Sequence, residues 1–599
     1  MAGPPRHVTD PAEFNRAFTR IAEQSQRLIS DFLQQQTQAG VLGLSDSARI
    51  SKAFLDMTQH MLRNPLHLVD AQLSLWRNYW GFWQQSTAAL WGQPGPGMLK
   101  SAESASPTDH DEWQDNFLFD FIKQSYLLTA RCLQCTVAQA VGLDEQTRKR
   151  LDFYTRQFVD AMAPANFPVT NPEVLRVTLE SGGENLLKGL QNLLNDLARG
   201  NHYLSLRDPP ADSFTLGETL ATTPGAVVYQ NDIMQLLQYA PSTDSVFQRP
   251  LLAVPPWINK YYVLDLRPQN SLIKWWVDQG FTVFVISWVN PGPEQTDKDF
   301  ADYLSEGILA ALDAIEQATG QRSVNAVGYC LGGTLLACAA AYLSSRRERR
   351  LRSCTYLTSL LDFEQPGELE VFIDEEELSL LEQHGQSQTD MPVDNSRLAA
   401  TFNMLRANDM IWSFFVEQYL LGKDSFPFDF LYWNSDSTRM PARLHRFYLR
   451  NMYQNNLLRE PGGITLLGKP IDLSKIKTPS YYLATQEDHI ALWHSVYSSA
   501  RLFSGPVRFV LGGAGHVAGV INPPDAQQYA YWSHEKDALQ TLENPADWLA
   551  GAQRQAGSWW QDWYNWVQPH TGPKVPARLP GAGKLPVLEA APGSYAKSR

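Results

Sequence analysis

Apolar residues recur at helical spacing through the first part of the chain, with polar residues between them. The run begins with Phe14, Phe18, Ile21, Leu28 and Phe32. This spacing predicts an N-terminal helical arm over residues 1–92, followed over 93–112 by a linker rich in Gly, Pro and Ser. Because the arm holds an aromatic-rich stretch around Trp80, it either packs on the main body or offers a surface to an apolar partner.

Helical spacing resumes after the linker and predicts a helical N-terminal domain over 113–212. From about residue 213, short β-rich apolar runs alternate with helical stretches. We expect strands at Ala226–Tyr229, Pro250–Val254, Thr282–Val289, Val324–Val327, Cys354–Leu361, Ser480–Ala484 and Val507–Leu511. This alternation predicts an α/β domain with a mostly parallel sheet covered by helices.

Two segments depart from this alternation. Residues from about 363 to 445 contain an acidic run and aromatic clusters, and an insertion between two strands often forms a cap over an active site. We therefore expect a catalytic domain over 213–566 with a cap at about 363–445. The tail, 567–599, is rich in Pro, Gly and Ala without periodicity, which predicts an extended or loosely attached segment.

Composition excludes several classes of function. The 599 residues include 50 Lys and Arg against 63 Asp and Glu, a formal net charge of −13, and no dense basic cluster, which argues against nucleic-acid binding. No run of about 18 apolar residues predicts a transmembrane helix. The chain starts without an apolar signal segment, so we expect a cytoplasmic protein.

The cysteines do not predict a disulfide scaffold or a metal site. Cys132 and Cys135 form a C-x-x-C pattern on a predicted helix, but no second Cys pair or His pair at zinc spacing accompanies them. We favour two ordinary helical cysteines over a redox or zinc site. No metal-ligand cluster is visible in the sequence, and no cofactor is expected.

Cys330 lies at the centre of the motif that carries the chemistry. The motif, Val327-Gly-Tyr-Cys-Leu-Gly-Gly333, follows a predicted strand and opens a helical stretch. This is the context of a nucleophile elbow, G-x-S-x-G, with Cys in place of Ser. Gly328 and Gly332 permit a tight turn that would project Cys330 outward. The alternative is a buried structural cysteine at a strand–helix turn.

An acid and a base follow the later predicted strands. An α/β-hydrolase places its acid after a later strand and its His after the last one. Glu487 and Asp488 follow the sixth predicted strand and compete for the acid role, while His516 lies in a Gly-rich loop after the seventh. The order nucleophile, acid, base therefore predicts an α/β-hydrolase core in which His516 reaches Cys330.

An oxyanion hole needs two backbone N–H donors. Leu331, directly after the nucleophile, supplies the first. Pro255 and Pro256 have no N–H, so the second comes from Trp257 or Ile258, and the sequence leaves this choice open. A thiolate nucleophile fits acyl transfer from a thioester donor, because exchanging one thioester for another is nearly balanced and keeps the acyl group reactive.

Seven short segments add a family resemblance. They are Ala161–Phe167, Val254–Asp265, Gly328–Gly333, Phe428–Asn434, Glu487–Trp493, Gly515–Pro524 and Gly557–Trp560. Together they resemble the class I polyhydroxyalkanoate synthases, and the similarity runs from about residue 115 to the C-terminus. One position departs from the family, since Val289 stands where the family commonly has Arg.

The resemblance implies an acyltransferase that polymerises (R)-3-hydroxyacyl-CoA into polyester. Short units such as 3-hydroxybutyryl-CoA, with some longer ones, are the implied substrates, and CoA is a product rather than a cofactor. The implied triad falls on Cys330, His516 and Asp488, with the His activating the thiol and the Asp helping to activate the incoming 3-hydroxyl. A mobile cap, a homodimer and attachment to polymer granules are also implied.

Two alternatives stay open from the sequence. A Cys-dependent thioesterase or depolymerase of the same fold would use water as the acyl acceptor. A noncatalytic granule-coating protein would bind through the aromatic-rich helices, but the order of Cys330, Asp488 and His516 argues against it.

Overall fold

The computed structural model describes residues 117–138, 145–198, 214–373, 393–394, 411–423, 429–436, 438–535 and 539–598. The chain divides into two compact units, one comprising Met1–Arg207 and Phe402–Phe426, the other Asp208–Thr401 and Pro427–Arg599. The predicted arm at 1–92 and linker at 93–112 lie outside the described residues.

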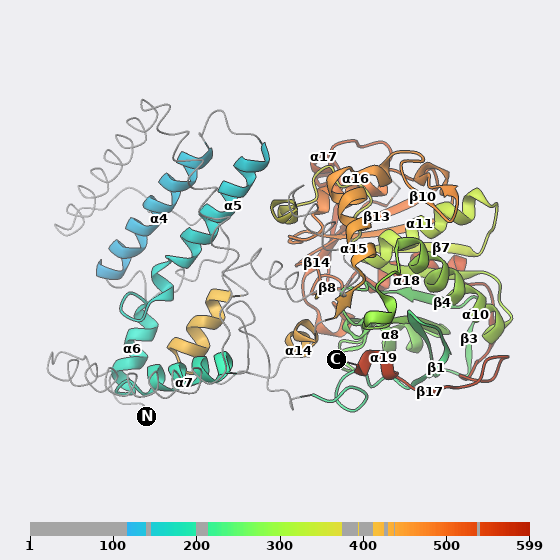
Figure 1. The fold of residues 1–599 in the computed structure, drawn as a ribbon, viewed down its shortest axis with the longest axis horizontal. Coiled ribbons are helices and arrows are strands. Elements are labelled where there is room, and N and C mark those ends of the chain that lie inside the picture. The colour runs from blue at the N-terminus through green and yellow to red at the C-terminus, as the bar shows by residue number, and fades with distance from the viewer. Residues whose placement is uncertain are drawn as a thin grey trace. The chain divides into compact units, whose positions relative to one another are not determined.

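The first unit is helical in its described part, as the spacing predicted. Its helices are α4 (Phe117–Ala138), α5 (Glu145–Ala161), α6 (Pro172–Glu180) and α7 (Glu184–Ala198). Figure 1 shows α4 and α5 running side by side. Asn171 caps α6 by accepting a hydrogen bond from the Val174 N–H at 3.1 Å. Cys132 and Cys135 both lie on α4 as free thiols.

Part of the segment predicted as a cap belongs to this helical unit. The helical turn η8 (Phe415–Leu420) packs along α7. The Asn185 side chain on α7 donates to the Leu420 carbonyl at 2.7 Å. Residues 411–423 thus pack with a helix that precedes them by more than 200 positions.

An eleven-stranded sheet runs through the second unit in the order β15-β14-β13-β12-β7-β6-β4-β5-β2-β1-β17 (Figure 1). Its strands, in chain order, are β1 (Gly225–Gln230), β2 (Met234–Tyr239), β4 (Leu251–Val254), β5 (Val283–Trp288), β6 (Val324–Tyr329), β7 (Leu351–Leu357), β12 (Ser480–Thr485), β13 (Val507–Gly512), β14 (Ala530–Ser533), β15 (Gln553–Ala556) and β17 (Glu589–Ala590). The central strands β13-β12-β7-β6-β4-β5 are all parallel. Antiparallel strands flank them at both edges.

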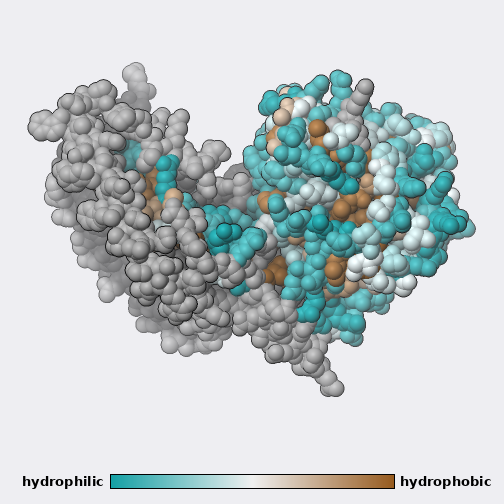
Figure 2. All heavy atoms as spheres, turned by 90° about the horizontal axis from the view of Figure 1, so that it is seen from above, coloured by the Kyte–Doolittle hydropathy of each residue, from teal (hydrophilic) through white to brown (hydrophobic). Residues whose placement is uncertain are grey.

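Helices and buried apolar side chains surround the parallel strands. The helices are α8 (Leu272–Asp278), α9 (Phe300–Asp302), α10 (Ala310–Thr319), α11 (Leu331–Ser345), α14 (Asp429–Ser435), α15 (Ala442–Tyr448), α16 (Trp493–Ala500), α17 (Pro545–Gly551), α18 (Trp560–Val567) and α19 (Ser594–Lys597). Every residue of β5, β6 and β12 is buried, as expected for strands covered on both faces. On the face seen in Figure 2, hydrophilic residues cover most of this unit and apolar residues form small separate patches.

All seven predicted strands are present, but two predictions about them are wrong. β7 ends at Leu357 rather than Leu361, because Thr358 takes a left-handed φ of 45° that turns the chain. β13 is not the last strand, since β14 and β15 follow it. All four residues of β15 are exposed, so this edge strand lacks the apolar pattern that identified the others.

The C-terminal tail is docked on the sheet unit. The short strand β16 (Lys574–Pro576) pairs with β3 (Ser245–Phe247), and β17 pairs with β1. Ala596 on α19 is buried. The prediction of loose attachment is therefore wrong for this part of the tail, because backbone pairing holds a segment whose sequence has no periodicity.

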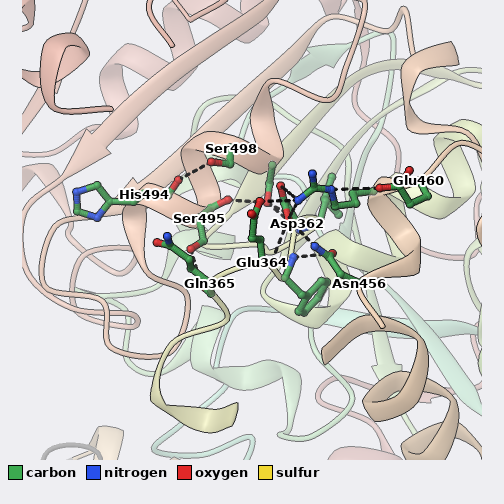
Figure 3. A network of polar contacts seen from close by, with 12 residues as sticks. Asp362, Glu364, Gln365, Asn456, Glu460, His494, Ser495 and Ser498 are labelled. Atoms are coloured by element: carbon green, nitrogen blue, oxygen red, sulfur yellow. Dashed lines mark hydrogen bonds and ion pairs between the residues drawn. The ribbon is translucent and has the colours of Figure 1, made fainter. Parts of the chain in front are cut away.

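A polar network fixes the exit from β7 (Figure 3). The buried Asp362 carboxylate accepts hydrogen bonds from Asn456 at 2.8 Å and Arg459 at 3.3 Å. The Ser499 hydroxyl on α16 accepts from the N–H groups of Leu361 and Asp362 at 2.9 and 3.0 Å. The network thus joins three segments that surround the carboxyl end of the sheet.

Candidate active site

Cys330 stands at a strained turn between β6 and α11. Its backbone has φ 52° and ψ −123°, a combination that costs a non-glycine residue free energy. The Cys330 N–H donates to the Leu357 carbonyl of β7 at 2.9 Å, which holds the turn against the neighbouring strand. The half-buried thiol is therefore presented at the carboxyl end of the parallel strands, as the elbow motif predicts.

The glycines of the motif allow backbone to approach backbone. A Cβ on Gly332 would collide with the carbonyl oxygen of Val254 in β4, and one on Gly328 would collide with the Cα of Gly333. The first turn of α11 therefore lies directly against β4 and β6. Any side chain at these two positions would displace the turn that carries Cys330.

Asp488 and His516 form a buried pair. The Asp488 Oδ2 lies 2.7 Å from His516 Nδ1, and the two side chains are 0% and 8% exposed. The other carboxylate oxygen accepts from the N–H groups of Ile490 and Ala491, each at 2.9 Å. These bonds fix the carboxylate and, through it, the orientation of the imidazole.

Glu487, the competing acid, points elsewhere. Its side chain is exposed, and its N–H donates to the Ala514 carbonyl at 3.0 Å. The geometry brings Asp488 to His516, which the adjacent positions in the sequence could not decide.

The imidazole connects Asp488 to the thiol. Burial disfavours a charged imidazole, but the charges of Asp488 and Cys330, with hydrogen bonds to both, outweigh it and raise the pKa of His516 to about 10. Cys330, His516 and Asp488 are thus arranged in series, with a hydrogen-bonding path from the thiol to the carboxylate. Such a series can take up and return a proton at the sulfur.

The raised pKa of His516 predicts a pH-dependent stability. Unfolded histidine titrates near about 6.5, so between this pH and about 10 only the folded chain holds the proton. The stabilisation is therefore complete below about pH 6.5 and is lost as the pH rises through about 10. We expect the free energy of unfolding, measured by denaturant titration, to decline over this range, and to decline less in His516→Gln. Parallel profiles for the two proteins would contradict this assignment.

The predicted oxyanion donors lie on two adjacent loops. Leu331 is the first residue of α11, and the first N–H groups of a helix have no acceptor within it. Trp257 and Ile258 are buried in the loop after β4. β4 runs parallel to β6, with Val254 beside Gly328, so both loops leave the sheet at the same edge. The fold therefore offers donors from both sides of Cys330.

Two tyrosines near the triad were not predicted as site residues. The Tyr329 hydroxyl donates to the His516 carbonyl at 3.2 Å, and the two rings stack at 5.5 Å between centroids. Burial, with added contributions from Cys330 and Asp488, raises the pKa of Tyr453. Tyr329 directly precedes the nucleophile, so its position was a usable signal, whereas Tyr453 has none because only folding brings it near the thiol.

Comparison with known proteins bears on the family and the fold. A family model described as the N-terminus of poly-beta-hydroxybutyrate polymerase (PhaC) matches residues 107–276, and a model of the alpha/beta hydrolase fold matches 268–523. The chain is 42% identical to the poly(3-hydroxyalkanoate) polymerase subunit PhaC of Rhizobium etli, over 99% of this chain and 94% of that one. The chain belongs to the poly(3-hydroxyalkanoate) polymerase family.

Further members of the polymerase family show similar identity. The poly(3-hydroxyalkanoate) polymerase of Methylorubrum extorquens is 44% identical over 94% of this chain and 92% of its own length. The polymerase subunit PhaC of Cupriavidus necator is 42% identical over 89% of each chain. The family and the α/β-hydrolase fold that the sequence predicted are therefore confirmed.

The described residues hold neither a metal-binding cluster nor a membrane-spanning helix. In that part of the chain, no group of three or more His, Cys, Asp or Glu side chains is placed to hold a metal ion. No described helix is both long and apolar enough to span a membrane.

Proposed function

We propose that this chain polymerises hydroxyacyl-CoA into polyhydroxyalkanoate, with Cys330 as nucleophile, His516 as general base and Asp488 as the group that orients it. The observation that carries the assignment is the buried Asp488–His516 pair placed beside the thiol at the elbow. Family membership supports the polymerase activity, and the cysteine at the elbow fits a substrate that is itself a thioester.

The first step transfers the acyl group from CoA to Cys330. His516 holds the proton of the Cys330 thiol, and the sulfur attacks the acyl-CoA carbonyl. The N–H of Leu331, with that of Trp257 or Ile258, stabilises the oxyanion that forms. The C–S bond to CoA then breaks, which leaves an acyl thioester on Cys330. The departing CoA thiolate takes up the proton that His516 holds.

The second step forms the ester bond. The 3-hydroxyl of an incoming hydroxyacyl-CoA attacks the thioester carbonyl on Cys330 and passes its proton to His516, while Asp488 stabilises the imidazolium. The bond from that carbonyl carbon to the Cys330 sulfur breaks as the ester forms, and the thiolate recovers the proton. The lengthened chain, now a CoA thioester, returns to Cys330 by repeating the first step.

The finer parts of the proposal rest on the family resemblance. They are an (R)-configured 3-hydroxyacyl substrate of short chain length, a homodimer, and work at the surface of a polymer granule in the cytoplasm. The part of the predicted cap that belongs to the sheet unit would then control access to Cys330.

The test follows CoA release and the organic product together. Purified protein incubated with (R)-3-hydroxybutyryl-CoA is expected to release CoA and form an insoluble polyester. CoA release with only free hydroxy acid would replace the polymerase with a thioesterase. No release across a series of longer acyl-CoA substrates would favour a noncatalytic granule-coating protein.

A further inference from the structure

The loop after β4, which holds the second oxyanion donor, is hydrogen-bonded to a segment far away in sequence. This segment consists of α14, Asp436, Thr438 and the short strand β9 (Arg439–Met440). The Thr438 hydroxyl donates to the Ile258 carbonyl at 2.6 Å, and the Trp433 indole N–H donates to the Lys260 carbonyl at 2.7 Å. Two backbone carbonyls of the loop are thus each held by a side chain.

A buried ion pair stabilises the same loop against the segment. Lys260 Nζ lies 2.7 Å from Asp436 Oδ1, and the two side chains are only 4% and 10% exposed. The second carboxylate oxygen accepts from the Tyr262 hydroxyl at 2.8 Å. Because losing one partner of a buried pair leaves an uncompensated charge, this contact resists movement of the loop away from the segment.

The geometry of a planar peptide connects these contacts to the chemistry. The Trp257 carbonyl and the Ile258 N–H belong to one trans peptide and point in opposite directions. Thr438 Oγ1 also lies 3.5 Å from the Trp257 carbonyl oxygen, a longer contact than its bond to Ile258. The two contacts together restrain the carbonyls of the peptides before and after the Ile258 Cα, and through them the direction of the Ile258 N–H.

We infer that Thr438 is a positioning residue for the oxyanion hole. Lys260 and Tyr262 on the loop support it by binding the Asp436 carboxylate of the same segment. The role rests on the proposed function, since it needs an oxyanion at Cys330. It selects Ile258 over Trp257 as the second donor, because Thr438 contacts the carbonyls on both sides of Ile258. The inserted segment thus contributes a positioning residue, Thr438, to the site.

The test compares Thr438→Val, which keeps the shape but loses the hydroxyl, with Thr438→Ser, which keeps the hydroxyl. Each protein is assayed for kcat and KM of CoA release and for the rate of Cys330 alkylation by iodoacetamide. Alkylation occurs at a saturated carbon and forms no oxyanion, so it reports the thiol and His516 alone. We expect Thr438→Val to lower kcat by about 10- to 100-fold with KM and alkylation within about twofold, and Thr438→Ser to retain at least about half of kcat.

The matched control is Ser435→Ala. Its hydroxyl donates to the Tyr432 carbonyl within the same segment at 3.0 Å, so removing it is expected to leave kcat unchanged. Unchanged kcat in Thr438→Val, or kcat and alkylation falling together, would overturn the positioning role.

A variant that does not fold and a failure of the proposed function can each be told apart from loss of the positioning role. If Thr438→Val shows no cooperative thermal unfolding, Asp436→Asn replaces it. We then expect kcat to fall while the rate of Cys330 alkylation stays unchanged. An equal loss of kcat and of alkylation would overturn the positioning role. Absence of CoA release by the unchanged protein across the whole acyl-CoA series would reject the proposed function itself, whereas equal release by the unchanged protein and Thr438→Val rejects the positioning role alone.

Discussion

Replacing Cys330 with Ser is expected to lower CoA release from hydroxyacyl-CoA by about 10⁴-fold or more. Serine fits the same strained backbone, so the fold and the Asp488–His516 pair stay in place. The serine hydroxyl loses its proton far less readily than a thiol does. An ester on this serine would also react further more slowly than the thioester on Cys330. The measurement is CoA release under saturating substrate, with the thermal unfolding temperature checked for both proteins.

Cys135→Ser provides the matched control for this prediction. Cys135 is an exposed free thiol on α4, so the same change there is expected to leave turnover intact. Turnover above about one hundredth of the unchanged protein in Cys330→Ser would mean that the nucleophile lies elsewhere.

Replacing His516 with Gln is expected to lower kcat by about 10³-fold. Glutamine can still hydrogen-bond but cannot take the thiol proton or return it to CoA. The buried Asp488 carboxylate would also lose the partner that lies 2.7 Å away. Alkylation of Cys330 by iodoacetamide near neutral pH should fall as well, because fewer molecules hold a thiolate.

His494→Gln is the control for the base. His494 is exposed on α16, six positions after Asp488, and its loss is expected to change neither CoA release nor alkylation. If His516→Gln alkylates at the unchanged rate and still releases CoA, another group must serve as the base.

The expected losses differ in what they reveal about the site. Cys330→Ser removes the nucleophile, and His516→Gln removes the proton acceptor and so affects both acylation and alkylation. Thr438→Val is expected to affect acylation alone. Comparing alkylation of Cys330 in His516→Gln and Thr438→Val, with Cys330→Ser as the blank, therefore separates activation of the thiol from stabilisation of the oxyanion.

Local sequence was enough for much of the fold. Several of the predicted strands, β5 among them, were found because a strand buried on both faces needs a continuous apolar run, which is visible in one short segment. The elbow was found for the same reason, because a tight strand–helix turn places glycines at fixed distances from Cys330. The chain order of Cys330, Asp488 and His516 completed the prediction of an α/β-hydrolase.

Edge elements and the tail could not be predicted in this way. β15 is wholly exposed, and β16 and β17 lie in a Pro- and Gly-rich tail, so their side chains carry no apolar pattern. What holds them is backbone pairing with strands elsewhere in the chain. Such pairing depends on an unfilled sheet edge, which is a property of the folded molecule.

The sequence by itself thus determined the fold class, the nucleophile motif and the order of the reacting groups, because each depends on residues close together in the chain. The spacing left open whether Asp488 or Glu487 faces His516, and the family resemblance implied Asp488. The tertiary structure supplied the physical reason, since neighbouring side chains can leave a loop in opposite directions. It also brought Thr438 to Ile258, 180 positions apart. Contacts of this range leave no periodic signal, because they form only when the sheet brings distant loops to one edge.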